Sequence, residues 1–325
     1  MADQMTMPAR APARVSPLTR FRRWEASGAL FALVVLSGLL AVASPYFFTL
    51  NNLPIVLRNA SFVGLVALGQ TLVLLIGGID LSVGAAAGLS AIVGALMLTK
   101  LGIHPYLIIP LTALFGLCLG FANALFVAKL KLNPFIVTLA SGEIFAGLNL
   151  VITQGYPVRP LGAFRVFGQT ELYGVPVPVI IFFVAALILW WVLTRTRFGR
   201  NIYAVGGNRD AAALVGIRVW RVEFIVFGLA GMFAALAGIL YASRMDAAQP
   251  SVGEGWMLSA ITAAIIGGTS LRGGEGTVIG TLFGALLLTV LQNGTVLMNV
   301  SGYWQRVIIG SVVLVAVLVD LFRRK

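Results

Sequence analysis

The chain has 325 residues, of which 59% are hydrophobic and only 10% are charged. A water-soluble domain carries about 25% charged residues, so this composition excludes a soluble fold and indicates a protein solvated largely by lipid. The formal net charge of +12 does not indicate a nucleic-acid binder, because the basic residues flank the apolar segments, where they set membrane orientation.

Windows of about twenty apolar residues mark membrane-spanning helices, and the sequence contains ten of them. The third and the eighth are short and rich in glycine, which predicts some short or broken helices. The predicted fold is therefore all-α, a polytopic transmembrane bundle. In chain order the spans are predicted at 28–48, 53–77, 81–99, 106–127, 134–152, 177–194, 222–241, 257–271, 276–297 and 303–322.

Loop charges predict the orientation of this bundle. With both termini in the cytoplasm, seventeen of the 23 lysines and arginines fall on cytoplasmic segments, which is the bias that sets topology. The domain organisation that follows is a basic cytoplasmic tail at 1–27 and a transmembrane domain at 28–325. The longest cytoplasmic connection is the loop 195–221.

A glycine-rich segment with a carboxylate separates the second and third spans. Gly77 and Gly78 permit a tight turn, and Asp80 or Ser82 can accept hydrogen bonds from the free amides that begin the next helix. Two interpretations stay open, a helix-capping turn and a broken-helix element at a translocation path or an ATPase contact. The motif Ile76–Leu81 recurs in similar form at Ile266–Leu271, and Gly94–Thr99 recurs at Gly284–Thr289 with the same offset of 190 residues, which indicates duplicated architecture.

The cytoplasmic loop contains the signals of a short helix. Asn208 is a good N-cap, the following residues are rich in alanine, and Gly216 is a natural stop. A helix of about two turns, roughly 10 Å long, is predicted at the membrane surface, where it would dock into a groove on a partner. The residues assigned to this contact are Gly199, Arg200, Asn208, Arg209, Asp210, Ala211, Ala212 and Gly216.

Polar residues inside the predicted spans are candidates for a translocation path. Glu143 lies near the bilayer midplane, where a charge costs about 2.5–3.5 kcal/mol or more unless it is paired or hydrated, so it should face the bundle interior. Buried amides can line a pore or join helices, and both roles stay open for them. These amides are Gln70, Asn123, Asn149, Gln292 and Asn293.

Enzyme classes find no support in the sequence. None of the four lysines belongs to a Gly-x-x-x-x-Gly-Lys-[Ser/Thr] phosphate loop, so the chain is not an ATPase by itself. It has no nucleophile elbow, and one cysteine and one histidine suggest no metal cluster. The outer loops 153–176 and 242–256 are long and polar enough to contact a soluble donor protein.

Four sequence blocks resemble a known family. They are Gly77–Gly84, Asn133–Ala140, Gly199–Asn208 and Ile266–Gly274, and together they are similar to the ribose/xylose/arabinose/galactoside permease family of bacterial ABC importers. The resemblance runs from about residue 28 to the end. Arg209 before Asp210 departs from the acidic residues often found there, and the tail before Arg20 has no counterpart.

The resemblance implies a multi-pass protein of the inner membrane that imports a monosaccharide or similar small polyol. It implies a second permease copy, a cytoplasmic ATPase that holds the ATP and magnesium, and a periplasmic binding protein that delivers the sugar. Three alternatives remain: an ion-coupled secondary transporter that uses Glu143, a branched-chain amino-acid importer permease, and a membrane enzyme or scaffold. The last lacks a catalytic constellation.

Overall fold

The computed structural model describes residues 27–323, so the predicted tail 1–27 lies, except for Ser27, outside the described residues. Ten apolar helices form a single bundle, and six of them are long enough to cross a membrane. This confirms an all-α polytopic membrane protein. The six helices long enough to cross a membrane are α3 (Asn52–Leu75), α5 (Pro105–Ala124), α6 (Pro134–Thr153), α8 (Val177–Arg195), α11 (Val219–Met245) and α13 (Val278–Leu297).

The other elements are shorter. A π-helical turn, η1 (Leu125–Lys129), extends α5, and each remaining apolar helix lies within or close to one of the predicted spans: α2 (Ser27–Ala43), α4 (Val83–Thr99), α12 (Trp256–Ile266) and α14 (Gly302–Arg323). Two helices without a membrane-spanning pattern are α9 (Arg197–Gly207) and α10 (Arg209–Leu214). The connection before α8 holds η2 (Gly162–Arg165), α7 (Val166–Gln169) and the hairpin β1 (Glu171–Leu172) and β2 (Val175–Pro176), paired Glu171 to Pro176.

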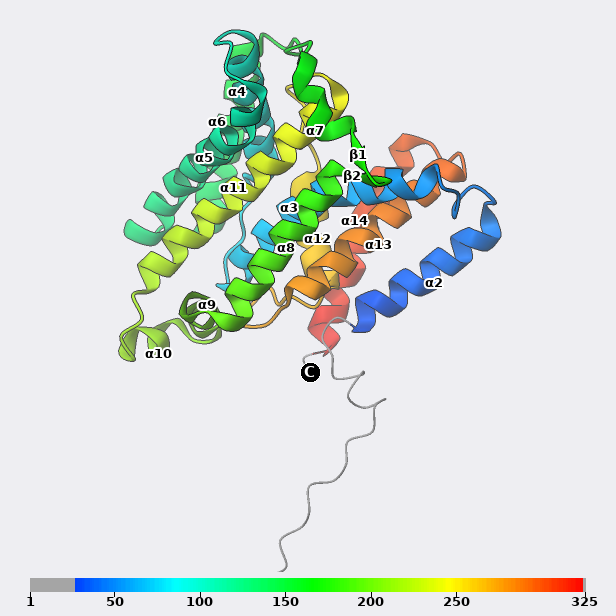
Figure 1. The fold of residues 1–325 in the computed structure, drawn as a ribbon. Coiled ribbons are helices and arrows are strands. Elements are labelled where there is room, and N and C mark those ends of the chain that lie inside the picture. Colours follow the sequence, from blue (N-terminus) through cyan, green and yellow to red (C-terminus); the bar gives the residue numbers. More distant parts are fainter. Residues whose placement is uncertain (1–26, 324–325) are drawn as a thin grey trace, which may run out of the picture.

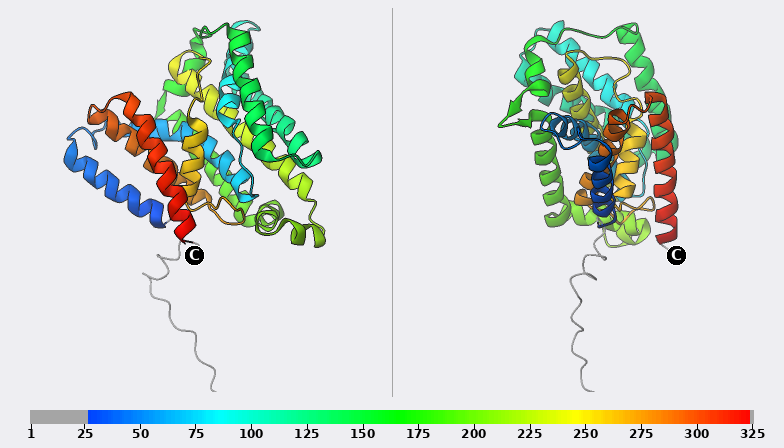
Figure 2. Two further views of the ribbon diagram at one scale, coloured as in Figure 1. Left: turned by 180° about the vertical axis from the view of Figure 1, so that it is seen from behind. Right: turned by 90° about the vertical axis from the view of Figure 1, so that its right-hand side faces the viewer.

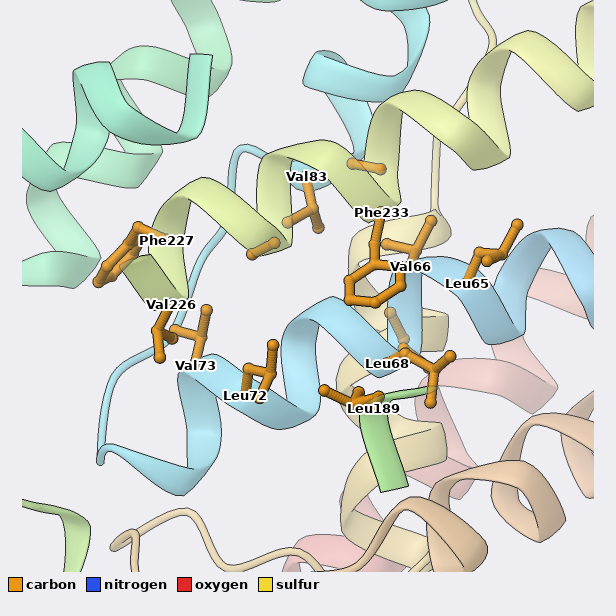
Figure 3. Packing of buried hydrophobic residues seen from close by; sticks show 14 of the residues in the cluster. Leu65, Val66, Leu68, Leu72, Val73, Val83, Leu189, Val226, Phe227 and Phe233 are labelled. Carbon is orange, nitrogen blue, oxygen red and sulfur yellow. The ribbon is translucent and has the colours of Figure 1, made fainter. Parts of the chain in front are cut away.

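The centre of the bundle is built by α3 and α11. Figure 3 shows Val226 of α11 beside Val73 of α3 and Phe233 of α11 beside Val66 of α3, with Leu189 of α8 close to Leu68. Most of α3 is buried, whereas only 17% of the apolar stretch of α6 is buried inside the bundle. The exposed faces of α6 are therefore available to lipid or to another chain.

Small residues bring α5 and α11 together. A Cβ built on Gly116 would collide with the Gly231 carbonyl, and one built on Gly120 would collide with the Phe227 carbonyl. Membrane helices lack a hydrophobic driving force between them and gain stability from such close backbone approach. The high glycine content of the sequence has this packing role.

The glycine motif after α3 forms a turn. The Gly78 amide donates to the Val73 carbonyl at 2.9 Å and the Gly77 amide to the Leu74 carbonyl at 2.8 Å, the two bonds of a Schellman motif. Gly77 has φ = +77°, which glycine adopts without strain. The chain then runs back into the bundle before α4 begins (Figure 1), and we call residues 78–82 the crossing segment.

The bundle has two distinct ends. The first residues of α2, the last of α14, and both α9 and α10 lie at one end, whereas α4 and α6 finish at the other (Figure 1). The views from behind and from the side in Figure 2 show the same arrangement. The residues that flank the two glycine motifs also meet at the first end, where the amide of Gly274, after the second motif, donates to the carbonyl of Leu75, before the first, at 2.9 Å.

Candidate functional site

The crossing segment is held by polar side chains from three helices. Asp80 is 1% exposed, and its Oδ1 accepts from the Ser82 amide at 2.8 Å and from the Ser82 hydroxyl at 2.6 Å. Asn123 of α5 donates to the Ser82 Oγ at 2.8 Å. Thr138 of α6 accepts from the Leu81 amide at 3.0 Å, so the side chains replace the hydrogen bonds that an irregular backbone lacks.

Gln70 of α3 belongs to the same network. In the orientation that satisfies both groups, its Nε2 donates to the Asp80 carbonyl at 3.1 Å and its Oε1 accepts from the Asp80 amide at 3.2 Å. The structure thus brings together four predicted residues, Gln70, Asp80, Ser82 and Asn123. The role of Thr138 was not predicted, because a threonine in an apolar helix usually bonds within its own helix, as Thr138 also does to the Pro134 carbonyl.

The prediction that Asp80 or Ser82 caps α4 is wrong. Ser82 occupies the N-cap position without a side-chain cap hydrogen bond, since its hydroxyl already donates to Asp80. The Asp80 carboxylate reaches Ser82 and none of the helical amides. The crossing segment is therefore an irregular stretch held by hydrogen bonds from α3, α5 and α6. A helix-capping turn does not describe it.

Asp80→Ala should destabilise the protein. Each lost hydrogen bond to a charged group costs about 1.5–3 kcal/mol, so we expect a clearly lower Tm in detergent, measured by the loss of monodisperse protein on heating. Asp80→Asn keeps one acceptor oxygen and should lower Tm by less. An unchanged Tm in Asp80→Ala would show that the crossing segment does not depend on this carboxylate.

A pocket of about 530 Å³ lies between the start of α4, the middle of α6 and the loop before α12. Gly84 of α4 and Gly253 of the loop touch through their backbones, because a Cβ on Gly253 would collide with the Gly84 carbonyl. The polar groups around the pocket include Glu143, Asn149, Ser251 and Glu254. We call it the α4–α6 pocket.

The prediction that Glu143 faces the bundle interior is wrong for this chain. Its side chain is exposed on the surface of the chain and lines the α4–α6 pocket. The physical reason is that α6 lies at the edge of the bundle, where few helices cover it. Asn149, six residues later, is 2% exposed and also lines the pocket.

The remaining amides separate into two groups. Asn293 of α13 and Asn52 of α3 exchange two side-chain hydrogen bonds, at 2.8 and 3.0 Å, so Asn293 joins helices. Gln292 lines a second pocket, of about 630 Å³, that also contains Glu254, Gln305 and Arg306. Among the predicted path residues, Glu143, Asn149 and Gln292 line these two pockets.

The predicted short helix is present as α10. The Asn208 side chain accepts from the Ala211 amide at 2.9 Å, which is the expected cap, and Gly216 ends the turn with φ = +85°. Ala212 is buried, whereas Asp210 and Ala211 are exposed. Leu214 and Val215 are 89% and 77% exposed, so the helix presents two bare apolar side chains.

The preceding residues were predicted as a loop, and this was wrong. They form α9, in which Thr196 accepts from the Gly199 amide at 3.1 Å and Ile202 and Val205 face the bundle. Glycines at both ends conceal this apolar face in the sequence. Arg200 is exposed, and Gly199 packs against the backbone at the end of α8.

An ion pair ties α10 to α11. Arg209 Nη1 lies 2.6 Å from Glu223 Oε1, and the Glu223 side chain is only 3% exposed. Arg209 is the residue that departs from the family pattern, and the structure gives it a partner on a spanning helix. The pair therefore joins α10 to the first turns of α11.

A junction of backbones connects α9 with the two glycine motifs. A Cβ on Gly206 would collide with the Leu75 carbonyl at the end of α3 and would also lie too close to the Gly274 amide. The Tyr203 hydroxyl of α9 donates to the Gly276 carbonyl at 2.8 Å. We call this contact the glycine junction, and through it α9 touches both the turn that precedes the crossing segment and the loop after α12.

The outer loops are folded against the bundle. The Leu161 amide donates to Asp246 Oδ1 at 2.9 Å, and Val158 pairs with Ala248. Arg58 of α3 forms an ion pair with Glu171 of β1 at 2.8 Å. A pocket of about 480 Å³ opens between these loops, lined by Pro157, Arg159, Pro160, Met245, Asp246, Ala247 and Gln249.

Comparison with known proteins identifies the class of protein. The sequence profile of the family described as "Branched-chain amino acid transport system / permease component" matches residues 52–318. The ribose import permease RbsC of Bacillus subtilis strain 168 is 44% identical over 90% of this chain and 92% of its own length. The Escherichia coli K12 ribose permease RbsC is 42% identical with the same coverage.

Other relatives point the same way. The D-allose transport system permease AlsC of Escherichia coli K12 is 38% identical over 91% of this chain and 92% of its own length. No solved structure matches the chain significantly. The family profile covers most of the chain and the relatives align over nearly their whole length. The chain therefore belongs to the family of permease subunits of bacterial ABC importers that its four sequence blocks resemble, and it is a multi-pass protein of the inner membrane.

Proposed function

We propose that the chain is the translocating subunit of an importer for a monosaccharide or similar small polyol. It is powered by a separate cytoplasmic ATPase and supplied by a periplasmic binding protein. The family description names branched-chain amino acids, but the relatives with 44% and 38% identity are named for ribose and allose. That similarity favours a sugar over an amino acid.

The observation that carries the proposal is the exposed pair on α10. Leu214 and Val215 project from a helix capped by Asn208, at the end of the bundle where α2 begins and α14 finishes. The positive-inside bias makes this end cytoplasmic. A short helix with an exposed apolar tip fits a groove on an ATPase. An ordinary solvated loop does not account for two exposed apolar side chains at one helix end.

The topology follows from this assignment. The ten apolar helices cross the membrane, and the N-terminal tail, loop 195–221 and the C-terminus are cytoplasmic. The folded outer loops with Arg159, Asp246 and Gln249 then face the periplasm. Their pocket of about 480 Å³ is available to the sugar-binding protein.

A second copy of the chain completes the pore. Glu143 is exposed halfway along α6, and a charge facing lipid there costs about 2.5–3.5 kcal/mol or more. A second copy that covers α6 removes this cost and places Glu143 beside an aqueous path. The alternative, an ion-coupled transporter, also uses Glu143, and it predicts transport by this chain alone.

Reconstitution tests the proposal. The chain should co-purify with its ATPase in detergent, and proteoliposomes should take up D-ribose only when the ATPase, ATP and the binding protein are all present. Uptake by the chain alone, driven by an ion gradient, would refute the importer. If uptake requires all three components but the transported solute is leucine and not D-ribose, the sugar assignment would be refuted.

The docking helix has its own test. Leu214→Asp combined with Val215→Asp should abolish co-purification with the ATPase, because a charge replaces each apolar contact at the centre of the proposed interface. The matched control is Leu101→Asp, since Leu101 is 71% exposed and follows α4 at the opposite end of the bundle. Retention of the ATPase by the α10 variant would place the docking surface elsewhere.

A further inference from the structure

The α4–α6 pocket contains a buried amide whose oxygen has no hydrogen-bond partner among the described residues. Asn149 is 2% exposed, and within residues 27–323 its Oδ1 has no hydrogen-bond partner. Leaving a buried acceptor unpaired costs about 1–3 kcal/mol, whereas Asn123 of α5 and Asn293 of α13 are hydrogen-bonded. A bound ligand in the pocket would supply the donor that this amide oxygen lacks, and a buried unpaired group in a native structure calls for such an explanation.

Two helices begin at this pocket. Gly84 and Ala85 belong to the first turn of α4, Met257 belongs to the first turn of α12, and all three line the pocket. The first amides of a helix have no partner inside it and carry its positive dipole end. The pocket is thus bordered by hydrogen-bond donors from two directions.

Acceptors complete the lining. Glu143 of α6 and Glu254 of the loop before α12 are exposed and border the same space, and Ser251 adds a hydroxyl. Leu139 and Leu150 of α6 supply apolar walls. The volume of about 530 Å³ lies within the range of roughly 300–1,000 Å³ of small-ligand sites.

The donors and acceptors select a class of ligand. A hydroxyl group both donates and accepts, so a neutral polyol can donate to Asn149 and the carboxylates while it accepts from the helix amides. Two carboxylates repel an anionic ligand, and a purely apolar ligand would leave the Asn149 Oδ1 unpaired.

We propose that the α4–α6 pocket is a transient polyol-binding site on the translocation path, in which Asn149 and Glu143 accept hydrogen bonds from sugar hydroxyls. This inference rests on the proposed function. It assigns an intermediate binding site for the sugar between the binding protein and the cytoplasm. Both residues bind the sugar, and neither transfers a proton.

The experiment uses the complete importer with D-ribose in proteoliposomes. Asn149→Leu, which keeps the side-chain volume, and Glu143→Leu should each lower the maximal uptake rate about tenfold, the effect of about 1.4 kcal/mol. The concentration of loaded binding protein at half-maximal uptake and the stimulated ATPase rate should stay at wild-type values. Glu143→Gln keeps an acceptor oxygen and should retain most of the uptake.

A control on the same helix separates the pocket from α6 in general. Ser141→Ala removes a hydroxyl whose hydrogen bond within residues 27–323 goes to the Thr138 carbonyl, and it should leave uptake unchanged. Glu143 is exposed, so its variants test the site even if Asn149→Leu fails to fold.

The outcomes distinguish the two proposals. The pocket proposal would be overturned if uptake stays unchanged in both Asn149→Leu and Glu143→Leu. If wild-type uptake still requires all three components, the importer proposal would stand. Loss of the stimulated ATPase rate together with uptake would also overturn it, since that shows a coupling role. Complete loss in Glu143→Gln would indicate proton coupling and contradict both.

Discussion

Gly206→Ala is expected to reduce ATP-driven uptake at least severalfold. The added methyl group meets the Leu75 carbonyl and the Gly274 amide, and neither backbone can yield without moving the end of α3 or the loop after α12. Overpacking of this kind costs about 1–3 kcal/mol, which shifts a two-state equilibrium by roughly 5- to 150-fold. Uptake and stimulated ATPase activity in proteoliposomes measure the effect.

The next residue supplies the control for the glycine junction. A Cβ on Gly207 meets nothing within 4 Å, so Gly207→Ala adds the same methyl group one position away without a collision. We expect wild-type uptake from it. Equal uptake in the two variants would show that α9 can move away from α3 without loss of coupling, and the junction would then have no role in transmission.

Arg209→Met is expected to lower uptake strongly, because it leaves the Glu223 carboxylate 3% exposed without its counter-charge. Removing one partner of a fully buried pair costs about 3–5 kcal/mol, and we expect roughly 1–3 kcal/mol here because the Arg209 side chain is 53% exposed. The second Glu223 oxygen already has no partner among the described residues, so it gives no alternative stabilisation.

A double variant tests whether the pair itself matters. Arg209→Met with Glu223→Gln removes both charges and should recover much of the uptake that Arg209→Met loses, which gives a coupling energy for the pair. A double variant as impaired as the single one would mean that Arg209 acts by touching the ATPase. Co-purification with the ATPase, measured for both variants, identifies which of these holds.

The spanning helices could be predicted because lipid imposes a length and a polarity on each of them. All ten predicted spans contain a helix, and the errors are at the ends. The span predicted at 257–271 stops at Ile266, since the glycines after it turn, and α11 extends to Met245, beyond the predicted 241. The helix α9 was missed because its apolar residues, among them Ile202 and Val205, are too few for a span.

The functional residues were predictable where the signal is local. Asn208 caps α10 as its sequence context indicates, because a cap depends only on residues within one turn. Contacts between distant segments have no such signal. Nothing near Asn293 indicates that Asn52, 241 residues away, is its partner.

The same reason separates Glu143 from Asn149. Position along α6 places both inside the membrane, but only the packing of neighbouring helices decides that Glu143 is exposed and Asn149 is buried. The sequence therefore identified the right helix and assigned its carboxylate to the wrong side.

The crossing segment also sets an order for insertion into the membrane. Its Leu81 amide is satisfied by Thr138, which lies 57 residues further along the chain, and its Ser82 hydroxyl is held by Asn123, so both partners are synthesised later. Unpaired backbone groups in lipid cost several kcal/mol each. The segment should therefore stay near the protein-conducting channel or water until α5 and α6 arrive, so that α3 to α6 enter the bilayer as one cooperative block rather than helix by helix.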